Sequence, residues 1–248
     1  MKRPDRNPPP SPSRTGLARA LSKLGHCSRS QGFTLIREGK VTLNGRVCRD
    51  PEQPVHLDRD TVQVEGGTLA AAVPVYFMLN KPRGLVTTTS DDQGRETVFA
   101  CFQNAKLPHL SPVGRLDKAS EGLLLFTNDN VWAHRITDPA THLPKTYHVQ
   151  VTGLLDDTRL TQLKKGVVDQ GETLTLRSVR LLRQGEKNSW LEIVLDEGRN
   201  RHIRRVLEAH QMEVLRLMRI AIGSLTLGEL PKGQWRALTA DEIAALSV

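Results

Sequence analysis

The clearest feature in the pattern of hydrophobic and polar positions is a continuous apolar run at residues 123–126. The run is short and lies between Gly122 and Asn128, so it predicts a strand that is buried on both faces. A polar turn carrying Arg115 and Asp117 comes just before it. A carboxylate held beside a guanidinium, ahead of a rigid strand, is one way to fix a reactive aspartate in space. A surface ion pair in a loop would leave the same pattern.

After residue 75, the chain shows both the two-residue alternation of strands and the spacing of about 3.6 residues that helices have. Strands are predicted where apolar residues alternate or form short β-branched runs, at residues 75–79, 85–89, 145–151, 190–195, 214–217 and 224–227. Helices are predicted between residues 129 and 139, 156 and 166, and 201 and 209, and a last strand and short helix within 235–248. Because these elements do not alternate regularly, they favour an α+β fold with a mixed, mainly antiparallel sheet flanked by helices.

Residues 16–66 have the pattern of a small separate domain. Leucines recur at helical spacing within residues 17–24, and Ser28 with Gln31 three positions later predicts the capped start of a second helix. Asn44 and Gly45, between two short apolar runs, predict a hairpin with a type I′ turn, because that turn needs two positive φ angles. Two helices and a hairpin are therefore expected here.

We predict four segments along the chain. Residues 1–15 contain five prolines and almost no large apolar side chain, which predicts a disordered basic tail. The small domain at residues 16–66 follows, then a weakly patterned linker at residues 67–74. Residues 75–248 form the larger domain.

Composition and charge limit the classes of function that this protein can have. The formal net charge is +8 and the pI is about 9.7, which is typical of a protein that binds a polyanion. The three cysteines are far apart and form no Cys-x-x-Cys motif, which argues against a zinc site or a disulfide framework and for a reducing compartment. Neither a membrane-spanning apolar run nor a secretory signal is found, so we expect a cytoplasmic protein.

The small domain resembles a known family. Residues 21–25, Ser28 with Arg29, and residues 36–46 together are similar to the S4 RNA-binding domain. The resemblance implies that two helices and a hairpin present a basic face to structured RNA. Carried over onto this sequence, the phosphate contacts would come from Arg29, Arg37, Lys40 and Arg46.

A second resemblance covers the larger domain. It rests on residues 114–117 with the apolar strand after them, on residues 145–147 and on residues 197–205, supported by residues 79–84 and 222–223. Together these segments resemble the pseudouridine synthases that modify ribosomal RNA, in the branch with an N-terminal S4 domain. That reaction breaks the bond between the base nitrogen and the ribose, rotates the uracil and rejoins it through carbon. The resemblance thus implies an isomerase that needs no cofactor and no metal.

The resemblance also implies roles for single residues. Asp117 would be the essential nucleophile or base, and Arg204 the cation that holds its charge, with Arg205 as the alternative. Tyr147 would stack on the target base. Arg115 would fill the space that the flipped uridine leaves, since a base inside a helix is out of reach.

Further residues are assigned less directly. Lys81, Arg201 and Arg205 are expected to contact RNA, and Leu217 is a candidate for packing against the uracil. His202 stands where the family commonly has Gln, and we expect it to serve as a hydrogen-bonding substitute that faces the loop before it.

Two other functions fit parts of the sequence. A glycosidase would pair two carboxylates, but Asp117 and Glu121, four positions apart across a turn into a strand, are poorly placed to flank one bond. A non-catalytic RNA-binding or ribosome-assembly factor would also use the S4 domain. We favour a monomeric enzyme acting on 23S rather than 16S ribosomal RNA, bare or in an assembly intermediate, with 16S ribosomal RNA or transfer RNA as alternative substrates.

Overall fold

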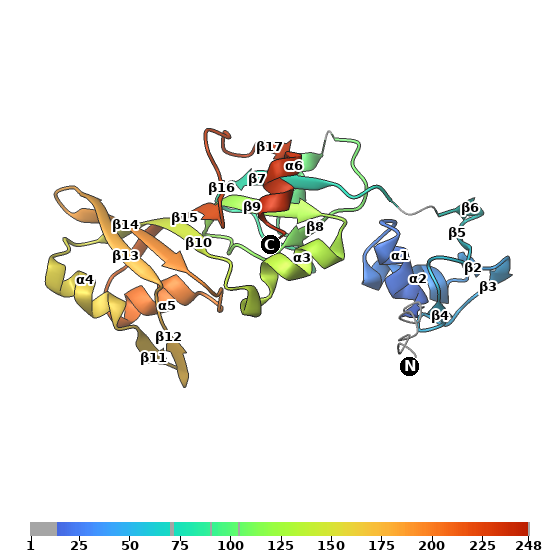
Figure 1. Ribbon diagram of the computed structural model, residues 1–248, viewed down its shortest axis with the longest axis horizontal. Helices are drawn as coiled ribbons and strands as arrows, with labels where there is room; N and C mark the ends of the chain where they lie inside the picture. Colours follow the sequence, from blue (N-terminus) through green and yellow to red (C-terminus); the bar gives the residue numbers. More distant parts are fainter. Residues whose placement is uncertain (1–13, 70–71, 90, 104, 248) are drawn as a thin grey trace, which may run out of the picture. The chain divides into compact units, whose positions relative to one another are not determined.

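The computed structural model describes residues 14–69, 72–89, 91–103 and 105–247. The chain divides into two compact units, residues 1–73 with 107–110, and residues 74–106 with 111–248 (Figure 1). Of the predicted tail, residues 1–13 lie outside the described residues, while Thr15 already belongs to the strand β1 (Thr15–Gly16).

The first unit contains the two predicted helices and the predicted hairpin. Helix α1 spans Leu17–Lys23 and helix α2 spans Arg29–Arg37, where Ser28 and Gln31 form the capping box. Asn44 and Gly45 both have positive φ angles, as the turn requires. The strands are β2 (Val41–Leu43), β3 (Arg46–Val47), β4 (Pro54–Val55), β5 (Val62–Val64) and β6 (Gly67–Thr68), of which β3-β2-β5-β6 form one sheet.

The sheet of the first unit continues into the predicted linker. Strand β6 pairs with β5, so residues 67 and 68 belong to the sheet. The turn between these strands is formed by Glu65 and Gly66, which have φ angles of 50° and 84°. Two successive positive φ angles reverse the chain tightly, which the composition of residues 67–74 does not reveal.

The second unit is built on one mixed sheet, as predicted. Its strand order is β13-β14-β10-β15-β9-β7-β17, with β16 paired to β15 and β8 to β9. The strands are β7 (Tyr76–Lys81), β8 (Ser111–Val113), β9 (Glu121–Thr127), β10 (Lys145–Thr152), β13 (Ser178–Gln184), β14 (Asn188–Leu195), β15 (Val214–Ile222), β16 (Leu225–Thr226) and β17 (Trp235–Ala237).

Helices and a small hairpin complete this unit. They are η1 (Val98–Phe102), α3 (Asn130–Thr137), η2 (Pro139–Thr141), α4 (Asp157–Lys164), α5 (His202–Ala209), α6 (Ala240–Ala245) and the strands β11 (Val167–Asp169) and β12 (Glu172–Leu174). In Figure 1, α4, α5 and the β11–β12 hairpin lie with β13 and β14, whereas α3 and α6 lie with β7, β9 and β17. The unit therefore has two halves that share the sheet.

The two halves of the sheet meet where β9 and β15 pair in parallel. This contact, which we call the β9–β15 joint, has only two residue pairs, Met218 with Glu121 and Arg219 with Gly122. Gly122 has a φ angle of +100°, and a Cβ atom there would overlap the carbonyl oxygen of Arg219. Glycine is required at this position because the two backbones come too close for any side chain.

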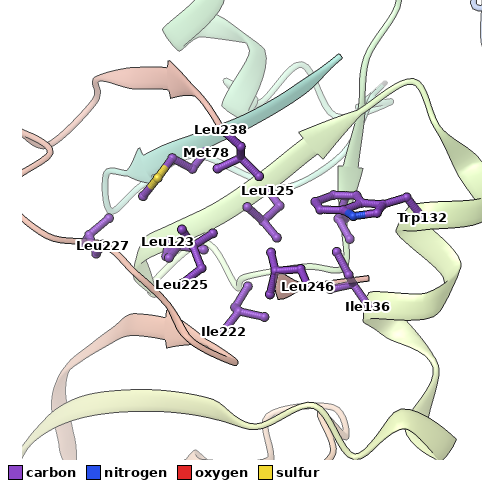
Figure 2. Close-up of a cluster of buried hydrophobic side chains, with 11 residues drawn as sticks. Met78, Leu123, Leu125, Trp132, Ile136, Ile222, Leu225, Leu227, Leu238 and Leu246 are labelled. Atoms are coloured by element: carbon purple, nitrogen blue, oxygen red, sulfur yellow. The ribbon is translucent and has the colours of Figure 1, made fainter. Parts of the chain in front are cut away.

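Strand β9 is buried along its whole length, as the apolar run predicts. Leu123 and Leu125 belong to a hydrophobic cluster that also contains Trp132 and Ile136 of α3 (Figure 2). On the alternate positions, Phe126 makes edge-on ring contacts with Phe102 and Phe99. The strand thus carries a rigid core on both faces, directly behind the turn that bears Asp117.

The strand predicted at residues 85–89 is wrong. Among the described residues of this segment, the only β pairing is an isolated bridge between Val86 and Thr97. Thr87 instead uses its buried hydroxyl to donate a 2.7 Å hydrogen bond to the carbonyl of Leu116. A β-branched composition favours a strand only where a neighbouring strand is available to pair with it.

Candidate active site

A cavity of about 520 Å³ opens in the second unit beside the β9–β15 joint. Its walls come from both halves: residues 113–120 and the end of α3 on one side, and β10, β15, the loop after β14 and the start of α5 on the other. This volume lies within the range of small-molecule sites and is large enough for one nucleotide.

Asp117 lines this cavity, half-buried, in the turn before β9. Among the described residues, its carboxylate forms neither a hydrogen bond nor an ion pair. Arg115, also at the cavity, is exposed. The structure therefore places Arg115 and Asp117 at one cavity without an ion pair between them, so the interpretation as a plain surface ion pair does not apply.

The backbone around Asp117 is held from several directions. The Lys81 ammonium donates hydrogen bonds to the carbonyls of Asp117, at 3.2 Å, and Ser120, at 2.8 Å. The Gly84 amide donates to the Lys118 carbonyl, and Thr87 binds Leu116. Four carbonyls of the turn thus accept hydrogen bonds, while the Asp117 side chain itself forms none among the described residues, as pre-organisation of a reactive group requires.

The assignment of Lys81 to RNA binding is wrong. Its side chain has no exposed surface, and its ammonium is surrounded by backbone carbonyls. Burial lowers the pKa of Lys81 to about 8, despite the nearby Asp117 and Glu121. A phosphate could reach this lysine only if the turn that carries Asp117 were taken apart, so the role of Lys81 is to support that turn.

Arg204 and Arg205, which the sequence left as alternative cations for Asp117, have different surroundings in the structure. Arg204 lines the cavity with Asp117 and donates to the carbonyls of Ala119 and Val214, while its buried Nε has no partner among the described residues. Burial and the nearby Arg201 lower the pKa of Arg204, and Asp117 opposes this effect.

Arg205 points away from this cavity. It forms ion pairs with Asp169, by a very short contact, and with Glu172 at 2.6 Å, both on the β11–β12 hairpin. The structure therefore corrects the expectation that Arg205 contacts RNA or serves as the cation for Asp117, because its guanidinium is already neutralised by two carboxylates.

Tyr147 and Leu217 lie on the opposite wall. Tyr147 on β10 is buried and lines the cavity, and its cross-strand partner on β15 is Arg219. Leu217, two positions before Arg219, lines the same cavity. An aromatic ring and an aliphatic side chain on one wall, facing a carboxylate on the other, can hold a planar base between them.

The start of α5 contributes Arg201 and His202. Arg201 is exposed, has a φ angle of 50° and lines the cavity. His202 is buried, and within the described part of the chain neither ring nitrogen has a partner of good hydrogen-bond geometry, although the Thr175 backbone interacts with the imidazole; its hydrogen-bonding role stays a prediction. Burial lowers the pKa of His202, although Glu197 opposes this, so the imidazole is neutral near pH 7.

The cavity is strongly basic. Its lining contains six cationic side chains and two carboxylates, Asp117 and Glu197. Three of the cations, Lys145, Arg199 and Arg219, were not given a role in the sequence analysis. The alternation of β10 could have revealed Lys145, which shares the face of Tyr147 two positions later. Arg219 reaches the cavity through cross-strand pairing, which one sequence does not show.

Glu121 does not form a carboxylate pair with Asp117. It is buried and pairs with Arg216 at 2.5 Å and Lys232 at 2.6 Å, and it is not among the residues that line the cavity. Burial alone would raise the pKa of Glu121, but the bonds to Arg216 and Lys232 outweigh it and lower the pKa. The pairing of Asp117 with Glu121 across one bond, which the glycosidase hypothesis requires, is therefore not formed.

In the first unit, the four predicted phosphate contacts are all on the surface. Arg29, Arg37 and Arg46 are exposed. Lys40 is exposed as well and lies 2.9 Å from Glu38 and 3.7 Å from Glu65. Exposed ion pairs of this kind are weak, so Lys40 remains able to exchange its partners for a phosphate.

The described residues contain neither a candidate metal site nor a candidate membrane span. No group of three or more His, Cys, Asp or Glu side chains there could hold a metal ion. No helix within the described ranges combines the length and apolarity that crossing a bilayer demands.

Comparisons with known proteins agree with this architecture. Residues 75–209 match the RNA pseudouridylate synthase family, and residues 15–61 match the S4 domain. The ribosomal large subunit pseudouridine synthase B of Bacillus subtilis is 35% identical over 93% of this chain and 94% of its own length. An uncharacterised RNA pseudouridine synthase of Aquifex aeolicus is 38% identical over 91% of both chains.

A solved structure supports the same conclusion. The crystal structure of a pseudouridylate synthase aligns with a TM-score of 0.66 and 30% identity, over 94% of this chain and 99% of that one. Sequence and fold thus agree along nearly the whole length. The chain belongs to the RNA pseudouridylate synthase family, as an RNA-modifying isomerase that carries an S4 domain ahead of its catalytic fold.

Proposed function

We propose that this protein converts one uridine of large-subunit ribosomal RNA into pseudouridine, with Asp117 as the essential carboxylate. The observation that carries the proposal is the position of Asp117. Its carboxylate is half-buried and unpaired within the described residues, and it lies at a basic cavity of nucleotide size, on a turn fixed by Lys81 and Thr87. A structural aspartate would have its charge satisfied by neighbours.

Five side chains at the cavity then have a role in the reaction. The target base leaves its stack, with Arg115 taking its place, and rests against Tyr147 and Leu217. Asp117 acts on the ribose or the base while the N-glycosidic bond breaks. Arg204, half-buried at the same cavity, supplies a positive charge near the carboxylate. The reaction is an internal rearrangement, so the atoms of the substrate are all retained in the product.

The choice of substrate rests on the relatives and on the first unit. The Bacillus subtilis relative is named for the large ribosomal subunit. The S4 domain offers exposed cations, Arg29, Arg37, Lys40 and Arg46, that suit the phosphates of a folded RNA. We propose that this unit supplies affinity with little sequence preference, and that residues 75–248 select and isomerise the uridine.

The test is to map pseudouridine in both ribosomal RNAs from cells with and without the gene. One pseudouridine of the large-subunit RNA should disappear in the deletion and return with the wild-type protein but not with Asp117→Asn. This substitution preserves shape and removes only the charge, so the variant should bind RNA within about twofold of wild type.

The other outcomes point elsewhere. A site lost from small-subunit or transfer RNA would change the substrate and keep the reaction. Unchanged pseudouridine in every RNA, or full restoration by Asp117→Asn, would contradict the proposed reaction or the role of Asp117, respectively.

A further inference from the structure

Among the described residues, five of the six cations at the cavity form no ion pair, and two of these five, Lys145 and Arg219, lie next to Tyr147 on the sheet. Lys145 begins β10, and Arg219 lies on β15 as the cross-strand partner of Tyr147. Lys145, Tyr147 and Arg219 all line the cavity, and we call this group the cavity floor. Within the described part of the chain, neither cation forms an ion pair with a carboxylate.

Arg219 is held in place and almost fully covered, and Lys145 is half-buried near it. Arg219 is only 5% exposed, donates a 2.8 Å hydrogen bond from Nε to the Leu123 carbonyl, and has a buried Nη2 without a partner. Burial and the neighbouring Arg219 lower the pKa of Lys145, while Asp196 opposes them. Two like charges in a dry site without a counterion destabilise the folded protein, and such arrangements are concentrated at functional sites.

The anion that fits these cations is absent from the resting substrate. A uridine base is neutral, but breaking its N1–C1′ bond leaves the electron pair on the base. The detached uracil then carries one negative charge, shared between its ring nitrogens and its two carbonyl oxygens. A base that rests against Tyr147 has its edge beside the side chains that flank this residue on the same face of the sheet, Lys145 along β10 and Arg219 across to β15.

We propose that Lys145 and Arg219 stabilise the detached, anionic uracil while it rotates; this rests on the proposed function. The N1–C1′ electrons go to the base, and the carboxylate oxygen of Asp117 compensates the electron-poor C1′. In this step the Asp117 oxygen bonds to C1′; after rotation, C5 of the uracil anion bonds to C1′ as the bond between C1′ and the Asp117 oxygen breaks. The freed Asp117 carboxylate then takes the proton from C5, and N1 gains a proton through water, which restores the neutral ring. Fixed charges directed at a developing anion lower the barrier most in a dry site.

A phosphate is the weaker candidate for the floor. Phosphates stay on the RNA backbone, close to solvent, where the exposed Arg115 and Arg201 line the same cavity. Arg219, by contrast, is almost fully covered. This difference allows a direct test, because a phosphate contact contributes to affinity and to its salt dependence, whereas stabilisation of an intermediate contributes to rate alone.

The experiment measures single-turnover pseudouridine formation by the full chain on a transcribed ribosomal RNA fragment, together with the Kd over a range of salt. Lys145→Met should slow the reaction about 100-fold, with the Kd and the salt slope unchanged. Lys164→Met, the same change on an exposed lysine of α4, should react at the wild-type rate. Lys145 is chosen because Arg219 also bonds across the β9–β15 joint, so that its replacement can disturb the fold.

A pH profile distinguishes the charge of Lys145 from a packing role. The lysine must be protonated to act, so the wild-type rate should fall as pH rises through a pKa that lies below 10.5. Lys145→Arg keeps its charge and should recover most of the rate without that fall. The other charged or titratable groups at the cavity or near Lys145 are shared by both proteins: Arg219, Asp196, Asp117, Tyr147, Glu197, His202, Arg115, Arg199, Arg201 and Arg204.

The outcomes separate the hypotheses. A weaker Kd and a salt slope reduced by about one in Lys145→Met would assign the floor to a phosphate and overturn the proposal. A wild-type rate in Lys145→Met, or an equal alkaline fall in Lys145→Arg, would overturn it as well. If the wild-type protein forms no pseudouridine in any RNA while still binding it, the proposed function fails, and this inference fails with it.

Discussion

Replacing Gly122 by alanine tests whether the β9–β15 joint holds the sheet and the cavity together. The substitution adds one methyl group at a φ angle of +100°, where the backbone of Arg219 leaves no room. The new Cβ would overlap the carbonyl oxygen of Arg219 and lie 2.9 Å from both its nitrogen and the Cγ of Met218. The joint has two residue pairs, so any shift there affects both.

The expected loss of stability has two parts. A positive φ angle costs a non-glycine residue about 1–2 kcal/mol, and overpacking in a closed site adds about 1–3 kcal/mol. Gly84 allows the parts to be separated, because its φ angle is +102° and a Cβ there would meet nothing within 4 Å. Gly84→Ala should therefore show the first part alone, and Gly122→Ala the sum.

Thermal unfolding followed by tryptophan fluorescence is the appropriate assay. The three tryptophans, Trp132, Trp190 and Trp235, all lie in the second unit, so the signal reports on that unit. One kcal/mol shifts the Tm of a domain of this size by about 2–4 °C. Gly122→Ala should melt at least about 2 °C below Gly84→Ala and lose isomerase activity. Equal Tm values would refute the close approach at the joint.

Two further predictions concern charges. Arg37→Ala should weaken RNA binding and reduce the slope of log Kd against log salt by roughly 0.7–0.9; an unchanged slope would exclude Arg37 as a phosphate contact. Glu121→Gln should cost about 2 kcal/mol at pH 7, because it weakens the bonds to Arg216 and Lys232. Since the pKa of Glu121 lies below its ordinary 4.5 in the folded state, this stabilisation is present above pH 4.5 and is lost as pH falls through the folded pKa. The Tm gap between wild type and Glu121→Gln should therefore narrow on acidification below pH 4.5, and a constant gap would contradict the pairing.

Patterns of local sequence predicted most of the elements. The capping box at Ser28, the turn at Asn44 and Gly45, and the buried strand β9 all depend on residues near each other in the chain. The strand predicted at residues 85–89 failed because a strand needs a neighbour to pair with, and within the described residues this segment forms only one isolated bridge, between Val86 and Thr97. Local features such as caps and turns can thus be predicted from the sequence, whereas the strand with which a segment pairs cannot.

In the candidate site, too, the residues were predicted from local motifs, whereas their surroundings were not. Arg115, Asp117, Tyr147 and Arg204 were picked out by motif, and the cavity brings all four together. Lys81 was misassigned because a lysine in a polar turn is usually exposed, and only the fold shows the carbonyls that surround it.

The β9–β15 joint also determines when, during synthesis, a new chain can become catalytically active. Its partners, Glu121 with Met218 and Gly122 with Arg219, are 97 positions apart. At typical synthesis rates of about 5–20 residues per second, β9 waits roughly 5–20 s for β15 to be made. The hairpins on either side can form from neighbouring residues in that interval, but the cavity cannot close. A nascent chain that already displays its S4 domain can therefore hold RNA before it is able to modify it.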